Sequence, residues 1–164
     1  IFLTLLIVQM ILGGMMSGIK AALVYPSFPD YAGSLIPEVL VNANSWQVDN
    51  FVNYERSPFL AGLVQLLHRT LGYLLFVMGF YIYYKCRLSW RKSGVKWSSS
   101  LFPIMLITQV LLGISVLVNS IGEIPITLGV LHQGVAILLL TCTVTLIYFD
   151  LGKTSDLKRE NRPG

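Results

Sequence analysis

Four long runs of apolar residues dominate this sequence of 164 residues. They cover residues 1–19, 59–84, 101–119 and 124–149. An α-helix rises about 1.5 Å per residue, so runs of this length can span the roughly 30 Å hydrocarbon core of a bilayer. The sequence therefore predicts four transmembrane helices.

The composition agrees with a membrane protein. Hydrophobic residues make up 54% of the chain and charged residues only 12%, about half the charged fraction of an ordinary soluble domain. The first run has no charged segment before it, no small-residue cleavage site and no initiator Met, so it does not resemble a signal peptide. We expect the chain to be a piece of a longer protein.

The basic residues predict the orientation of these helices. Five of them lie between the second and third runs with no acid among them, and four more follow the fourth run: Lys85, Arg87, Arg91, Lys92, Lys96, Lys153, Lys158, Arg159 and Arg162. Basic loops stay on the cytoplasmic side of a membrane, or on the matrix side in a mitochondrion. The acidic connection 20–57 and the short connection around Glu123 then lie outside.

These features predict one fold class, an all-α transmembrane four-helix up-down bundle with a long structured outer loop. The bundle would occupy residues 1–152 and a polar cytoplasmic or matrix tail residues 153–164. The membrane would be the bacterial cytoplasmic membrane or the mitochondrial inner membrane. The net charge of +4 is explained by this topology, and its distribution does not indicate a nucleic-acid surface.

The outer connection 20–57 is predicted to be a folded loop. Its prolines stop helices, and a short interfacial helix can start after Pro37. Its aromatic residues suit contact with lipid at the headgroup level: Tyr25, Phe28, Tyr31 and Trp46. The loop could cap the outer mouth of a site in the bundle.

The chain has only two histidines, and both lie inside apolar runs. His68 lies nine residues inward from Phe59, roughly 13 Å along a helix, and His132 lies seven residues inward from Pro125, roughly 10 Å. A single buried histidine often serves only as a hydrogen-bonding group, but two at matched depth on different helices favour axial ligation of one haem iron. Zinc would need further ligands, and no third His, Cys or carboxylate is available at that depth.

Two neighbours of His68 are candidate cofactor-binding residues. Arg69 points about 100° away from His68 on a helix, and its planar guanidinium could pair with a haem propionate or snorkel to the outer interface. Gln65 lies one turn outward on the His68 face. Small residues flank both histidines and either leave room for a flat ligand or let helices pack closely: Ala61, Gly72, Gly79, Gly129 and Ala136.

The two cysteines are predicted to be unpaired thiols. Cys86 lies at the inner end of the second run and Cys142 lies inside the fourth, so neither geometry nor redox compartment favours a disulfide between them.

Four segments resemble, in order, the C-terminal four-helix half of the haem A synthase family. They are "AALVYPSFPDYAGSLIPE", "VQLLHR", "TQVLLGISVLV" and "IPITLGVLHQGVAILLL", and together they cover essentially the whole chain. That family is an oxidoreductase of haem biosynthesis, which converts a methyl group of haem O to the formyl group of the haem A used by terminal oxidases. The resemblance implies a haem b cofactor, with its iron bound by His68 and His132.

The resemblance also implies a division of labour. The N-terminal half of the same enzyme would bind haem O, and a glutamate there stands three residues before its HR pair, where this chain has Gln65. The cysteine pair in an outer loop of some N-terminal halves is also absent. The chain is therefore interpreted as the cofactor half, which passes electrons to an unidentified acceptor, and catalytic residues remain unidentified in it.

Two other functions fit the same residues. A membrane cytochrome b without synthase activity would hold one haem on the same two histidines. A proton relay or transporter would use His68 and His132 as titrating groups and would show no haem absorbance.

Overall fold

The computed structural model describes the backbone of residues 1–92 and 96–160, and the side chains in this part except those of residues 86, 88–92, 96–97 and 150–160. Four long helices account for most of it: α1 Phe2–Gly18, α4 Phe59–Lys92, α5 Lys96–Val118 and α6 Ile126–Glu160. Within the described part there is no β-strand and the regular structure is helical, which confirms the predicted all-α class.

Five short helical turns lie between α1 and α4. They are η1 Ala21–Leu23, α2 Glu38–Val41, η2 Ala43–Ser45, α3 Val48–Val52 and η3 Tyr54–Arg56. Extended pairing in the described residues is limited to one bridge, between Tyr31 and Ser34. The connection 20–57 is therefore a folded loop, as its prolines and aromatic residues predict.

Three of the four long helices are long and apolar enough to cross a membrane. These spans are Phe59–Lys85, Ser98–Val118 and Ile126–Phe149. Helix α1 is a shorter apolar helix of 17 residues, about 25 Å, within the run predicted at residues 1–19. Within lipid, a helix satisfies its own backbone hydrogen bonds, which explains why the apolar runs adopt this form.

Two helices continue beyond the apolar runs. The backbone of α4 stays helical to Lys92 and that of α6 to Glu160. The predicted polar tail 153–164 therefore begins as a helix, and residues 161–164 lie outside the described part. The side chain of Cys86, predicted to be an unpaired thiol, also lies outside it, whereas Cys142 is a buried free cysteine.

Helices α4 and α6 both start directly after a proline. Pro58 precedes α4 and Pro125 precedes α6, and each proline carbonyl accepts a hydrogen bond from the helix, from Gly62 N at 2.9 Å and from Gly129 N at 3.0 Å. A proline at this position loses nothing by lacking an N–H, because the first turn of a helix has no acceptor for it.

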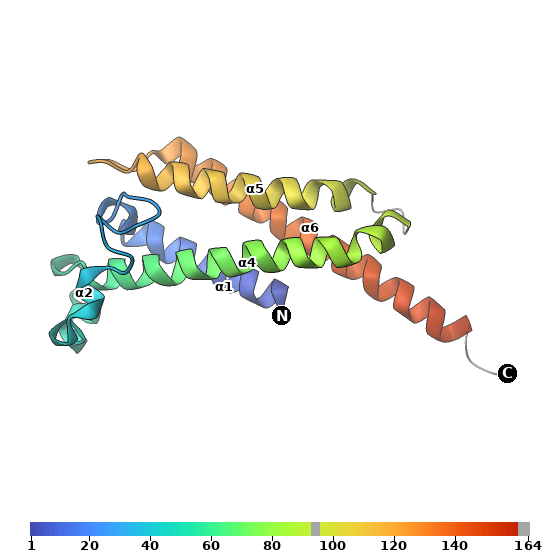
Figure 1. Cartoon of the computed structure of the whole chain (residues 1–164), viewed down its shortest axis with the longest axis horizontal. Coiled ribbons are helices and arrows are strands. Elements are labelled where there is room, and N and C mark those ends of the chain that lie inside the picture. The colour runs from blue at the N-terminus through green and yellow to red at the C-terminus, as the bar shows by residue number, and fades with distance from the viewer. Residues whose placement is uncertain (93–95, 161–164) are drawn as a thin grey trace.

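The four long helices form an up-down bundle. Helix α1 packs against α4, α4 against α5, α5 against α6, and α6 against α1. The α1–α4 loop and the α5–α6 connection lie at the same end of the bundle (Figure 1), which we call the loop end. This arrangement agrees with the predicted placement of both connections on one side of the membrane.

All four helices contribute to one apolar core. Its buried members lie on the side of the bundle away from the loop end, and the rings of Phe2 and Phe102 pack with centroids 5.9 Å apart. The cluster consists of Phe2, Leu6, Leu75, Phe102, Leu106, Leu139, Cys142 and Leu146. This core fixes the register of the helices and, with it, the depth of every residue nearer the loop end.

Candidate functional site

Each long helix contributes one polar side chain to a layer just beyond the core. These four residues, which we call the polar layer, are Gln9 of α1, His68 of α4, Gln109 of α5 and His132 of α6. The core residues Leu75 and Leu139 lie seven residues inward from His68 and His132, respectively, about 10 Å in each case. The two imidazoles therefore lie at one depth in the bundle.

The side chains of the polar layer contact one another in two matched pairs. Gln9 Nε2 lies 3.2 Å from His68 Nε2, and Gln109 Nε2 lies 3.3 Å from His132 Nε2. The bundle thus brings together two imidazoles from different helices, each with an amide partner from the preceding long helix.

A glycine of a neighbouring helix packs closely against each imidazole ring. A Cβ atom added at Gly13 would lie 3.3 Å from His68 Cε1, and one added at Gly113 would lie 3.0 Å from His132 Cε1. Both distances are tighter than ordinary van der Waals contact, so an alanine at either position would press on the ring. The absence of a side chain here allows α1 and α5 to approach the histidines closely.

The polar layer also contains most of the buried polar atoms that lack a hydrogen-bond partner in the described part of the chain. Four of the five belong to it, namely Gln9 Oε1, His68 Nδ1, Gln109 Oε1 and His132 Nδ1, and the fifth is Arg69 Nε. Buried polar groups are normally paired, so such a concentration marks a functional layer more readily than a structural one.

Gln9 was not among the residues singled out from the sequence, although a sequence signal for it exists. The pattern Phe-x3-Leu-x2-Gln-x3-Gly occurs at residues 2–13 and again at residues 102–113. In the structure both copies pack against the helix that follows and place Gln and Gly against its histidine. The repeat therefore relates α1 and α4 to α5 and α6.

Gln65 and Arg69 lie nearer the loop end and hold the loop that follows α1. Gln65 is fully buried, and its Nε2 donates to the backbone oxygens of Ala21 at 3.4 Å and Tyr25 at 3.3 Å. Its Oε1 accepts a hydrogen bond of 3.2 Å from Arg69 Nη2. The amide of Gln65 is thus occupied within the protein.

The Arg69 guanidinium binds backbone carbonyls of the same loop. Nη1 donates to Asp30 O at 2.9 Å and Pro29 O at 3.4 Å, while Nη2 donates to Ser27 O at 2.8 Å and Tyr25 O at 3.3 Å. Only Nε has no partner in the described part of the chain. The propionate contact predicted for Arg69 stays a prediction, and the contacts present here give this residue a role in anchoring the loop.

Tyr31 of the same loop also contacts the Arg69 guanidinium. Its buried ring lies under the Arg69 guanidinium, with Cζ 4.1 Å from the ring centroid. Burial raises the pKa of the Tyr31 hydroxyl, and the nearby Arg69 charge lowers it only in part. The ring therefore stays neutral and offers its π face to the cation.

The small residues near the histidines serve different purposes. A Cβ atom at Gly79 would lie 2.6 Å from Leu106 Cδ1, so this glycine allows close packing of α4 and α5 and does not leave room for a ligand. A Cβ atom at Gly72 would lie 3.3 Å from Gln9 Nε2, so this glycine makes room for the amide. A Cβ atom at Gly129 would meet nothing within 4 Å.

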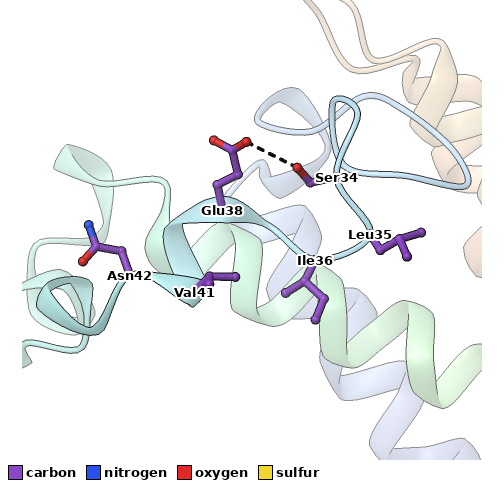
Figure 2. Close-up of a pocket in the computed structure, with 6 residues that line it drawn as sticks. All are labelled: Ser34, Leu35, Ile36, Glu38, Val41 and Asn42. Carbon is purple, nitrogen blue, oxygen red and sulfur yellow. Dashed lines mark hydrogen bonds between the residues drawn. The ribbon is translucent and has the colours of Figure 1, made fainter.

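Two surface hollows occur in the loop region. One is lined by residues of the segment 34–42, where Ser34 Oγ donates to Glu38 Oε1 at 3.3 Å (Figure 2). The other lies between the end of α1 and the start of α4 and includes Lys20, Arg56 and Ala61. Neither hollow is lined by a residue of the polar layer, so both are separate from the histidine pair.

The donor set of the polar layer fits a haem better than a bare metal ion. Among the described residues, no group of three or more His, Cys, Asp or Glu side chains could hold a metal ion. A structural zinc site needs such a group, whereas a haem iron already has four ring nitrogens and needs only axial ligands. Two imidazoles at one depth, each able to offer a lone pair on Nε2, suit that requirement.

Comparison with known proteins identifies relatives along most of the chain. Residues 1–144 match the family model COX15-CtaA, described as cytochrome oxidase assembly protein. A protein named heme A synthase from Bradyrhizobium sp. strain BTAi1 is 35% identical over 139 residues, which are 84% of this chain and 36% of the relative. A heme A synthase from Bartonella bacilliformis is 30% identical over 141 residues, 85% of this chain and 36% of the relative.

A third relative gives the same picture. The heme A synthase of Dinoroseobacter shibae is 32% identical over 130 residues, 77% of this chain and 30% of the relative. The chain thus spans about a third of the length of the curated relatives it matches. No solved structure matches the chain.

With three helices able to cross a membrane and bacterial relatives, the chain is an integral protein of the cytoplasmic membrane.

Proposed function

Because the chain belongs to the COX15-CtaA family of cytochrome oxidase assembly proteins, we propose that it is the haem b-binding half of a haem A synthase. The whole enzyme would oxidise a methyl group of haem O to the formyl group of haem A. In this proposal His68 and His132 are the axial ligands of the haem b iron. The relatives named heme A synthase support the overall activity.

The observation that carries the proposal is the polar layer. Its two imidazoles lie at one depth on different helices, and each has an amide partner and a glycine behind it. Neutral imidazoles are the usual histidine ligands of iron, and a haem b bound in this way supplies one-electron transfer. Oxidation of a methyl group releases electrons, so an electron carrier next to the substrate suits the reaction.

The residues around the layer would set the environment of the cofactor. The apolar core closes the bundle on one side of the histidines, and the loop held by Arg69 and Gln65 lies on the other. Direct cofactor contacts of Arg69 and Gln65 remain part of the proposal, and Arg69 Nε is the atom that is free for one. Exclusion of water from a haem is one of the means by which a protein sets its potential.

In this proposal the substrate and the partners would be bound by parts of the enzyme outside this chain. The N-terminal half of the same enzyme would bind haem O, and an unidentified acceptor would take the electrons. The three spans contain no Asp or Glu, so a carboxylate for the chemistry has to come from elsewhere. Bilayer lipid would surround the helices, and no nucleic-acid partner is proposed.

The test is spectroscopic. We expect the purified full-length protein to show a low-spin haem b spectrum that depends on His68, and His68→Ala and His132→Ala should each remove the signal contributed by this half. Gln133→Ala, at an exposed position beside His132, is the matched control and should leave the spectrum unchanged.

The outcome also separates the other functions that fit these residues. An unchanged spectrum in His132→Ala would refute the proposed ligation. A parent protein without haem absorbance would favour the proton relay, whereas a haem-loaded parent that forms no haem A would favour a plain membrane cytochrome b.

A further inference from the structure

The amide of Gln9 contacts His68 through two atoms. Gln9 Nε2 donates to the His68 backbone oxygen at 3.0 Å and also lies 3.2 Å from the ring nitrogen Nε2. Because a carbonyl oxygen can only accept a hydrogen bond, the Gln9 atom that faces it must be the NH2 group. The backbone contact therefore fixes the orientation of the amide, which ring contacts alone would leave open.

The fixed amide determines which nitrogen of His68 carries the proton. An amide NH2 group donates and does not accept, so His68 Nε2 has to offer its lone pair to Gln9. A neutral imidazole then carries its proton on Nδ1. In the opposite tautomer two donors would face each other at 3.2 Å, and Nδ1 would still lack a partner.

The second pair repeats this arrangement. Gln109 Nε2 lies 3.3 Å from His132 Nε2, and Gln109 occupies the same place in its copy of the repeat as Gln9 does. The Nδ1 atom of His132 lacks a partner in the described part of the chain, as that of His68 does. Both imidazoles therefore present the same nitrogen to the same kind of group.

We propose that Gln9 and Gln109 are matched positioning residues, each of which holds the neighbouring histidine in the neutral tautomer with its lone pair on Nε2. The benefit for a cofactor rests on the proposed function, because an imidazole binds iron only through an unprotonated nitrogen. The glutamines would keep that nitrogen unprotonated before the cofactor arrives, and each amide would leave it when iron binds, because both use the same lone pair. They act through the histidines and are not ligands themselves.

The packing around each amide supports this role. Gly72 leaves room for the Gln9 amide, since an added Cβ atom would lie 3.3 Å from Gln9 Nε2. Gly13, one turn along α1 from Gln9, lies against the ring of His68. One helix thus supplies both the group that selects the tautomer and the gap that seats the ring.

The tautomer can be measured without any haem. In the full-length protein, extracted from membranes in detergent and stripped of haem, histidines labelled with 15N report each ring nitrogen, because protonated and bare nitrogens resonate at well-separated shifts. His68→Ala and His132→Ala assign the signals. We expect a bare Nε2 and a protonated Nδ1 for both histidines.

Substitution of the glutamines tests their role. Gln9→Leu should move the Nε2 signal of His68 toward the protonated position and leave His132 unchanged, and Gln109→Leu should do the reverse. Gln133→Leu, at an exposed glutamine, should change neither. A protonated Nε2 in the parent, or an unchanged His68 signal in a folded Gln9→Leu protein, would overturn the proposal. If Gln9→Leu does not insert, the parent spectrum and Gln109→Leu decide.

A haem titration tests the consequence for the cofactor. The apparent affinity for haem b scales with the fraction of His68 whose Nε2 is bare, so Gln9→Leu should weaken binding of added haem b by the factor that the NMR populations give. A parent protein that binds no haem b at this half would refute the proposed function, while the NMR result would still decide the tautomer. Equal haem affinity in Gln9→Leu and parent, with the expected tautomer change, would refute the role in cofactor binding.

Discussion

Gly113 illustrates how much of the candidate site depends on single atoms. An added Cβ atom would lie 3.0 Å from His132 Cε1 and 3.6 Å from both ring nitrogens. We expect Gly113→Ala to displace the imidazole, because overpacking in a well-packed interior costs about 1–3 kcal/mol and the ring has to move to relieve it. Haem b affinity should fall about tenfold, a loss of about 1.4 kcal/mol.

The control for this prediction is Gly129→Ala. Gly129 lies one turn from His132 on α6, and an added Cβ atom would meet nothing within 4 Å. Haem titration of both variants, with the low-spin absorbance as the readout, checks the prediction. Equal affinities in the two variants would show that the close approach of Gly113 to the ring is unimportant for binding.

The loop after α1 is the element whose position depends most on buried polar contacts. Arg69 donates to four of its carbonyls and stacks on Tyr31, while Gln65 donates to one of the same carbonyls, Tyr25 O, and to Ala21 O. We expect Arg69→Leu to release the loop, because it leaves those carbonyls without their donor at a cost on the order of 3 kcal/mol. Residues 20–57 should then be cut faster in limited proteolysis.

Arg56→Leu is the matched control for the loop. Arg56 is exposed in η3, so its loss should leave the rate of cleavage unchanged. Arg69→Lys should give an intermediate rate, because an ammonium keeps the charge but lacks the planar fork that reaches several carbonyls. A cleavage rate in Arg69→Leu equal to that of the parent would contradict the anchoring role.

The elements were more predictable from the sequence than their contacts. Apolar length places the three membrane-crossing helices within a few residues, because lipid leaves a long apolar run little choice but a helix. Helix α1 occupies Phe2–Gly18 of the predicted run 1–19, and a turn with Lys20 in the left-handed region follows it. The folded loop was also anticipated from its prolines and aromatic residues.

Side-chain partners were harder to predict because they depend on helix rotation and register. Arg69 is close in sequence to His68, which suggested a cofactor contact, yet its guanidinium turns to carbonyls about 40 residues earlier in the chain. Gln9 lies 59 residues from His68, and only the comparison of the two copies of the repeat points to it. Gly79 proved to be a packing residue for the same reason, since its neighbour Leu106 is on another helix.

At the scale of the whole molecule, the repeat gives the bundle a twofold character. Helices α1 and α4 carry one Gln, Gly and His set, and helices α5 and α6 carry the other. Because the two sets meet in one layer above a shared core, a single flat cofactor would encounter equivalent surroundings on both faces. The copies differ toward the loop end, where Gln65 and Arg69 in α4 correspond to Gly129 and Gln133 in α6.

This asymmetry bears on the chemistry that the chain can perform. Gln65 stands where the resemblance places a glutamate in the proposed substrate half, and its amide is already bound to Ala21 O, Tyr25 O and Arg69. A carboxylate at this position would face two carbonyl oxygens and has no hydrogen to donate to them. It would therefore weaken the attachment of the loop and would not be positioned to act on a substrate.

We therefore expect neither residues 1–164 nor their Gln65→Glu variant to form haem A from haem O, even when loaded with haem b. Stabilising charge or removing a proton during oxidation of a methyl group suits a carboxylate close to the substrate, and the polar layer has none. Both proteins should be incubated with haem O and an oxidant beside the full-length enzyme, and the extracted haems separated by chromatography. Gln65→Glu should also speed cleavage of the loop, as Arg69→Leu does. Haem A formed by residues 1–164 alone would refute the division of labour between the two halves, and would indicate that two copies of this bundle can assemble into a working enzyme.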